Sequence, residues 1–141
     1  MNSVIVDTGY WIALFEEKDP HHDLAEIAFN ESGSYRLIIP WPTMYEFMNT
    51  RFARRPLNVL KFEKILKKPG NVLLNDTGYR EAALDIFFGE SNTQRRTMSL
   101  VDIVLRNMIA DRELQIHSLA TFNRADFHDI CLRRNIAIIP D

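Results

Sequence analysis

Residues 4–8 read Val4-Ile5-Val6-Asp7-Thr8, a short run of β-branched residues that ends at an acid and a hydroxyl. A short apolar run of this kind, closed by turn-forming residues, is typical of a strand buried on both faces of a parallel sheet. A turn and a helix are expected to begin directly after Asp7. The stretch therefore indicates an α/β fold with an acid at the end of a buried strand.

The same alternation of strand and helix continues along the chain. Further strands are predicted at residues 37–39, 72–74, 115–119 and 137–139. Helices are predicted over residues 19–33, 43–53, 56–68, 77–88, 99–113 and 124–134. The first of these is expected to start at Asp19-Pro20, because Asp caps helices and Pro suits the first helical position. Such alternation predicts a mostly parallel sheet of about five strands, covered by helices on both faces.

Composition narrows the class of protein. The 141 residues are 46% hydrophobic and 26% charged, which predicts one globular domain over residues 1–141 and excludes a disordered tail. The net charge of -2 argues against binding nucleic acid by bulk electrostatics alone. A single cysteine, Cys131, excludes a disulfide framework and a Cys-rich zinc site, and we expect it to be a small buried residue.

The cellular location of the protein is predicted from two features that the sequence lacks, a secretory signal and a membrane span. The segment from Met1 to Phe15 has no basic leader and carries Asp7 within its apolar run, so it is a poor secretory signal. No stretch approaches the roughly 18 to 20 apolar residues that span a bilayer. We therefore expect a soluble cytoplasmic protein with no membrane contact.

Four acids stand where predicted strands end or helices begin. Asp7, Glu46 and Asp126 each come soon after a strand, and Asp102 lies one turn into the helix that starts at Ser99. In parallel sheets, ligands bind beyond the carboxyl ends of the strands. We therefore expect these carboxylates to converge at one edge of the sheet.

Each acid, taken singly, is better explained as part of a helix cap. Glu46, Asp102 and Asp126 stand three residues after a possible cap, the spacing of a capping box, and Asp7 can cap the helix that follows it. The three possible caps are Thr43, Ser99 and Asn123. Four such acids converging on one crevice would favour a different interpretation.

Carboxylates gathered in one crevice repel one another, and a divalent cation removes that cost. Mg²⁺ or Mn²⁺ suits hard oxygen ligands and keeps several waters. No cluster competes for a softer metal, since His21 and His22 are adjacent while His117 and His128 stand alone. The pattern therefore indicates a magnesium or manganese site.

The motifs, in their order along the chain, resemble those of the PIN-domain ribonucleases, and within them the VapC-type toxins of toxin–antitoxin pairs. The resemblance covers nearly the whole chain. It rests on residues 4–8, Asp19-Pro20-His21-His22 with Ala25, Pro42-Thr43-Met44-Tyr45-Glu46, Ser99-Leu100-Val101-Asp102, Thr121-Phe122-Asn123-Arg124-Ala125-Asp126-Phe127, and Ile136-Ala137-Ile138-Ile139-Pro140.

The resemblance implies an α/β/α sandwich that hydrolyses RNA phosphodiester bonds with Mg²⁺. It implies that Asp7 and Asp102 are the main metal ligands, and that Glu46 and Asp126 complete the site directly or through water. Thr8 and Ser99 match the hydroxyl positions beside the first and third acids.

One departure leaves the fourth ligand open. The family's last motif usually reads Thr-x-Asp followed by a second Asp or His before Phe, and here Asn123 stands at the first acidic position and Asp126 at the second. Either Asp126 supplies the charge, or Asn123 binds through its amide oxygen. This departure favours an alternative function, a catalytically weak PIN-like module that binds RNA or protein without cleavage. A phosphohydrolase with Asp7 as nucleophile is disfavoured, because Gly9 stands where a second acid is wanted.

RNA would need positive charge near the acids. The candidates are Arg51, Arg54, Arg55, Arg95 and Arg96, although any one of them is better explained as ordinary solvated surface. The resemblance also implies a homodimer and an antitoxin that inserts a segment into the active-site groove. The apolar helices between Trp11 and Phe62 are where this partner surface is expected.

Overall fold

The computed structural model describes residues 2–91 and 98–141, which form an α/β fold around a parallel sheet. All strand pairs in the described chain are parallel, in the order β3-β2-β1-β4-β5. The strands are β1 (Ser3–Val6), β2 (Arg36–Pro40), β3 (Val72–Leu74), β4 (Ser118–Ala120) and β5 (Ala137–Ile139). The central β1 lies where the strand order reverses, which is where ligands bind in open parallel sheets.

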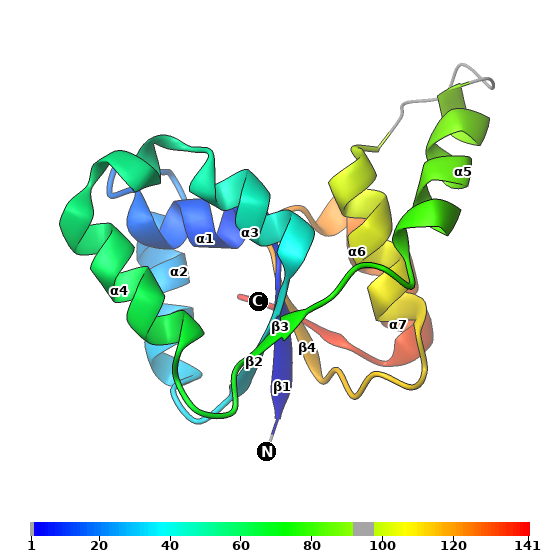
Figure 1. Ribbon diagram of the computed structural model, residues 1–141. Helices are drawn as coiled ribbons and strands as arrows, with labels where there is room; N and C mark the ends of the chain where they lie inside the picture. Colours follow the sequence, from blue (N-terminus) through cyan, green and yellow to red (C-terminus); the bar gives the residue numbers. More distant parts are fainter. Residues whose placement is uncertain (1, 92–97) are drawn as a thin grey trace.

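Helices cover both faces of this sheet (Figure 1). On one face lie α1 (Thr8–Phe15), α2 (His22–Glu31), α3 (Trp41–Met48), the 3₁₀ turn η1 (Arg51–Arg54) and α4 (Pro56–Leu66). On the other face lie α5 (Arg80–Ser91), α6 (Leu100–Ala110) and α7 (Arg124–Arg134). In residues 2–91 and 98–141, no helix is both long and apolar enough to cross a membrane. The predicted three-layer α/β/α arrangement is confirmed.

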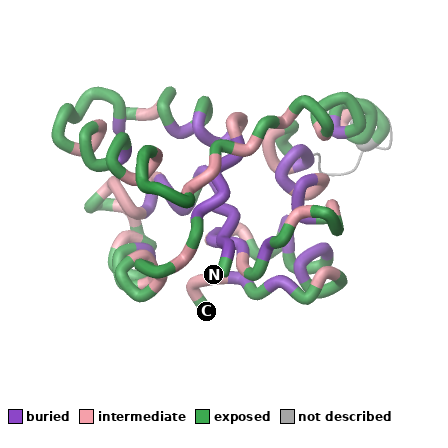
Figure 2. Tube along the Cα trace, turned by 60° about the horizontal axis from the view of Figure 1, so that its bottom comes forward, coloured by how far each residue is buried: buried purple, intermediate pink, exposed green. Residues whose placement is uncertain are grey.

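The sheet separates two hydrophobic cores. Val4 and Val6 pack with the helices of the first face, whereas Ile5 between them packs with those of the second. Successive side chains of a strand point to opposite faces, so a continuous β-branched run supplies both cores. Figure 2 shows the buried chain concentrated in the central strands and the exposed chain on the outer helices. Cys131 is buried in the second core, and burial raises the pKa of its thiol to about 11.

The predicted start of α2 at Asp19-Pro20 is wrong. The helix begins at His22, and the Asp19 carboxylate instead accepts a hydrogen bond from the His21 backbone N–H at 2.8 Å. This bond forms a local turn, a common alternative to capping for Asp. The helix also ends at Glu31, two residues before Gly33.

The predicted helix over residues 43–53 is also corrected. It begins at Trp41 and ends at Met48, and a separate 3₁₀ turn follows. Pro40 occupies the N-cap position, so the Thr43 hydroxyl lies inside the helix and donates to the Pro40 carbonyl oxygen at 2.7 Å. The Thr43–Glu46 capping box is therefore wrong. Smaller differences of one to three residues are found at the ends of α4, α5, α6 and β4.

Candidate active site

Asp7 links β1 to α1 and is held by hydrogen bonds on both carboxylate oxygens. It is 6% exposed. Its Oδ1 accepts from the Thr8 backbone N–H at 2.8 Å, as an N-cap, and its Oδ2 accepts from the Thr121 hydroxyl at 2.8 Å. The cap interpretation of Asp7 is confirmed. The second bond comes from the residue that directly follows β4, so Asp7 also connects its own turn to a remote segment of the chain.

The ionised form of Asp7 is disfavoured in this structure. The pKa of Asp7 is raised from 3.8 to about 6, mainly by burial and in smaller part by the charges of Asp102 and Glu46, while the hydrogen bonds from Thr121 and Thr8 lower it. Asp102 and Glu46 therefore both lie close enough to Asp7 to repel its charge at the carboxyl end of β1. A cation at this edge would offset both the free-energy cost of burying the charged carboxylate and the repulsion from the other two acids.

Asp102 and Glu46 lie on two helices on opposite faces of the sheet, Asp102 in the first turn of α6 and Glu46 near the end of α3. Asp102 is half-buried in the first turn of α6, and the Ser99 hydroxyl oxygen caps that turn by accepting from the Asp102 N–H at 3.1 Å. Ser99 is thus a confirmed helix cap. Glu46 is exposed on α3, and the Thr8 hydroxyl donates to the Thr43 carbonyl oxygen of the same helix at 3.5 Å. The Thr8 hydroxyl therefore connects α1 to α3.

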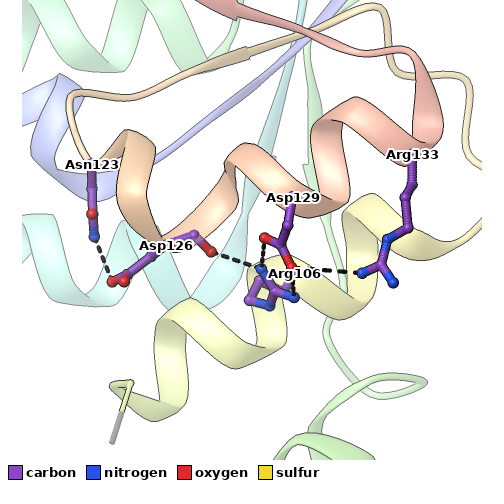
Figure 3. Close-up of polar contacts among 5 residues, drawn as sticks. All are labelled: Arg106, Asn123, Asp126, Asp129 and Arg133. Carbon is purple, nitrogen blue, oxygen red and sulfur yellow. Dashed lines mark hydrogen bonds and ion pairs between the residues drawn. The ribbon is translucent and has the colours of Figure 1, made fainter. Parts of the chain in front are cut away.

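Asn123 and Asp126, the two candidates for the fourth ligand, are bonded to each other (Figure 3). Asp126 is buried in the first turn of α7, and the Asn123 side-chain amide donates to its Oδ2 at 2.7 Å. Asn123 occupies the N-cap position but its side chain makes no bond to the helix N–H groups, so its capping interpretation is wrong. A hydrogen bond thus joins the two candidates, and which of them would hold a metal stays a prediction.

Thr121 contacts Asp7, although no motif of the sequence assigned it a role. It is 1% exposed, it donates to Asp7, and its hydroxyl oxygen accepts from the Asn123 N–H at 2.9 Å. The strand register explains the contact, because Val6 pairs with Ala120 and the next residues, Asp7 and Thr121, lie side by side. A hydroxyl directly after a strand was the available signal, but only the pairing of β1 with β4 makes it informative.

We expect Thr121→Val to raise the pKa of Asp7 further and to weaken metal binding by about 10-fold, as for lost partners of metal ligands. The reason is that the hydroxyl stabilises the charged carboxylate. Thr121→Ser keeps the hydroxyl and should bind nearly as the wild type does. Calorimetric titration with Mn²⁺ measures both variants. Equal affinities for Val and Ser would show that the hydroxyl does not support the site.

The donors near Asp7 suit a hydrated magnesium ion better than a closed metal cage. Within residues 2–91 and 98–141, no three His, Cys, Asp or Glu side chains converge closely enough to share one coordination sphere. Mg²⁺ commonly keeps several waters and takes one or two carboxylates plus substrate phosphate. Asp7 and the two acids that repel its charge are carboxylates of the kind that Mg²⁺ prefers, and their binding of an ion stays a prediction.

The candidate RNA-binding arginines that the structure describes lie away from Asp7. Arg51 and Arg55 line a hollow of about 390 Å³ beside Phe15, at the far end of α1. Arg55 is paired with Glu16, its Nη2 lying 3.3 Å from Oε2. Because α1 has eight residues, this end is about 12 Å from Asp7. Arg95 and Arg96 lie outside the described residues.

A larger hollow of about 870 Å³ lies between α2 and α4. Its lining includes the apolar Phe29 and Ile65. Leu57, at its edge, is among the most exposed large apolar side chains of the described chain. Charged residues of opposite sign stand on the two helices, Glu26 on α2 and Lys61 on α4. This region falls within the predicted partner surface.

No protein-family model and no curated protein sequence matches the chain. Solved structures do. VapC20 of Mycobacterium tuberculosis, described as a Sarcin-Ricin loop cleaving toxin, superposes with a TM-score of 0.70 at 16% identity, over 89% of this chain and 94% of that one. VapBC2 of Rickettsia felis, solved bound to a DNA fragment from its promoter, gives 0.62 at 11% identity, over 96% of each chain. The chain thus has the PIN-like fold of these proteins.

Proposed function

We propose that this chain, which shares its fold with VapC toxins, is a Mg²⁺-dependent endoribonuclease and the toxin of a toxin–antitoxin pair. One observation carries the proposal. A buried carboxylate, Asp7, stands at the end of the central strand with its pKa raised to about 6, partly by two further acids. Strongly perturbed acids in such a position are typical of functional sites.

In the proposed site, Asp7 and Asp102 hold the metal, with Glu46 and Asp126 contributing directly or through water. Bound Mg²⁺ would activate a water molecule and neutralise charge on the scissile phosphate. Mn²⁺ has the same ligand preferences and would be accepted.

The chain's own contribution is to orient these ligands. The Thr8 N–H and the Thr121 hydroxyl fix both oxygens of Asp7, so the carboxylate needs little reorganisation when a cation binds. Ser99 fixes the turn that carries Asp102. Ligands held in this way lose little entropy on binding, which increases metal affinity and positions the substrate phosphate.

RNA is the proposed substrate because VapC20, which shares the fold, is described as cleaving the Sarcin-Ricin loop, and a metal held by the acids would bridge them to an RNA phosphate. Arg51, Arg54 and Arg55 would contact only a strand that extends over α1 and α3, since they lie at the far end of α1. Arg95 and Arg96 remain candidates from the sequence.

We further propose an antitoxin as the protein partner and a homodimer as the assembly. The VapBC2 neighbour supports an antitoxin, because its structure is a complex of this kind. The hollow between α2 and α4, with its apolar lining and charged walls, suits an apolar segment flanked by both charges.

An alternative function is favoured by one observation. Asn123 stands where the family usually has an acid, and it donates to Asp126 rather than adding a negative charge. A site with one acid fewer would bind metal more weakly. Such a protein would bind RNA or a protein partner without cutting.

Cleavage of RNA by the purified protein, with Mg²⁺ or with EDTA, decides between these functions. We expect Mg²⁺-dependent cleavage that falls on the order of 100-fold or more in Asp102→Asn. Asp85→Asn, an exposed acid on α5, is the matched control and should cut normally. RNA binding without cleavage would instead support the alternative function.

The pair Asn123–Asp126 supplies a further prediction. We expect Asp126→Ala to weaken the Mg²⁺ dependence of cleavage strongly and Asn123→Ala only mildly, because a carboxylate attracts Mg²⁺ more than an amide does. Asn123→Asp replaces a donor by a charge 2.7 Å from Asp126, so its metal-free form should unfold at a lower temperature and recover with Mg²⁺.

Titrations of Mg²⁺ against cleavage rate and unfolding temperature measure all three variants. If Asp126→Ala lowers stability by about 0.5 to 2 kcal/mol and leaves the metal titration unchanged, Asp126 only stabilises the start of α7.

A further inference from the structure

Arg106 joins the two helices that carry Asp102 and Asp126. It lies on α6 one turn after Asp102, and its side chain is 21% exposed. Its Nη1 donates to the Asp126 backbone carbonyl oxygen at 2.8 Å (Figure 3). One guanidinium thus connects the helix of one proposed metal ligand to the backbone of another.

Asp129 holds this guanidinium in place. The two terminal nitrogens of Arg106 donate to the two oxygens of Asp129, at 2.6 Å and 2.9 Å. This two-point contact fixes the plane and direction of the guanidinium, as a single contact cannot. The hydrogen bond from Arg106 lowers the pKa of Asp129 to about 2, so the partner stays charged at neutral pH.

The position of the contact distinguishes it from an ordinary surface ion pair. Asp102 and Arg106 are four residues apart and share one face of α6. The Asp126 carbonyl belongs to the first turn of α7, next to the side chain that Asn123 contacts. Arg106 therefore restrains the separation of Asp102 and Asp126, rather than merely adding a charge pair to the surface.

We propose that Arg106 is a positioning residue that sets the distance between Asp102 and Asp126 and thereby the affinity of the site for a divalent cation. The inference rests on the proposed function. In this role Arg106 would act through the two acids and not directly on the metal or the RNA.

Mn²⁺ alone, titrated calorimetrically into the full chain without RNA, tests the proposal. Arg106→Ala should weaken Mn²⁺ binding by about 10-fold or more, the effect expected for a partner of metal ligands. Arg106→Lys keeps the charge but not the two-point geometry, so it should lose several-fold. The loss of cleavage should be recovered by raising the Mn²⁺ concentration.

Arg133→Ala is the matched control. Arg133 also lies near Asp129, with Nη2 3.6 Å from Oδ2, but both residues belong to α7, so this contact does not connect α6 to α7. The Arg133→Ala substitution removes the same charge at a similar place, and we expect its Mn²⁺ affinity to stay within about 2-fold of the wild type. If Arg106→Ala does not fold, Asp129→Asn removes the anchor while leaving Arg106, and should weaken binding several-fold.

Unchanged Mn²⁺ affinity in a folded Arg106→Ala or Asp129→Asn variant would overturn the proposal and leave a purely structural ion pair. An equal loss in Arg133→Ala would also overturn it, since the effect would then be one of charge. Failure of the wild-type protein to bind Mn²⁺ would refute the proposed function, and the role of Arg106 with it. The two failures are therefore distinguishable.

Discussion

Asp7→Asn is expected to abolish Mg²⁺-dependent RNA cleavage while stabilising the metal-free protein. The loss of activity follows from removing the charge of the most buried proposed ligand, and should be on the order of 100-fold or more. The gain in stability follows from the pKa of Asp7, which the fold raises from 3.8 to about 6. A neutral side chain avoids the free-energy cost of burying an ionised carboxylate.

The direction in which the stability of the folded state changes with pH follows from the same raised pKa of Asp7. Below about pH 4, Asp7 is protonated in both the folded and the unfolded state and costs nothing. As the pH rises through 4 to 6, the unfolded chain loses its proton first, so the folded state loses relative stability, by about 3 kcal/mol in total. Asp7→Asn carries no such proton and should lack this fall in stability.

Thermal unfolding in EDTA at pH 4, 5, 6 and 7 measures the effect for the wild type and the variant. The two unfolding temperatures should be similar at pH 4 and should differ by several degrees at pH 7, with the variant more stable. Added Mg²⁺ should stabilise the wild type and not the variant. Asp85→Asn is the control, and a variant that still cuts RNA would remove Asp7 from the mechanism.

Phe47→Ala is expected to cause the largest loss of stability, about 3 to 5 kcal/mol. Phe47 is fully buried on α3, directly after Glu46, with its ring centroid 4.2 Å from that of Phe52 and 5.0 Å from that of Phe62. Truncation removes these contacts and leaves a cavity beneath the helix that carries Glu46.

Urea unfolding of two further variants controls this prediction. Phe47→Leu preserves most of the volume and should lose much less stability, while its metal affinity stays close to that of the wild type. Phe88→Ala removes a ring that is 58% exposed on α5 and should change stability by less than about 1 kcal/mol. Equal losses for Phe47 and Phe88 would contradict the described core.

The order of strands and helices along the chain could be predicted from the local sequence pattern, because apolar residues recur with different periods in strands and in helices. The run Val4–Val6 and the alternating helices indicate buried parallel strands, and the structure confirms them. Helix starts were less predictable. Asp19 bonds to a nearby N–H in a turn and Pro40 takes the cap position before Thr43, because short polar side chains and prolines suit several local conformations.

The candidate acids could be chosen from the sequence because they follow strands or, as Asp102 does, stand in the first turn of a helix, although their roles in metal binding remain predictions. The hydrogen bonds that hold these acids in place could not be predicted from the sequence. Thr121 donates to Asp7 across 114 residues, and Arg106 reaches the backbone of Asp126 from another helix. Such partners depend on strand register and helix packing, which no local pattern contains.

The sequence by itself therefore determined the α/β class, the buried first strand and the acid that ends it, since periodicity and burial act on neighbouring residues. Only the tertiary structure decided that β1 lies between β2 and β4, which puts Asp7 beside Thr121. It also decided that Asn123 donates to Asp126. The physical reason is that hydrogen-bond partners and electrostatic repulsion depend on distances between remote segments, and those distances are set by the packing of the whole sheet and its helices.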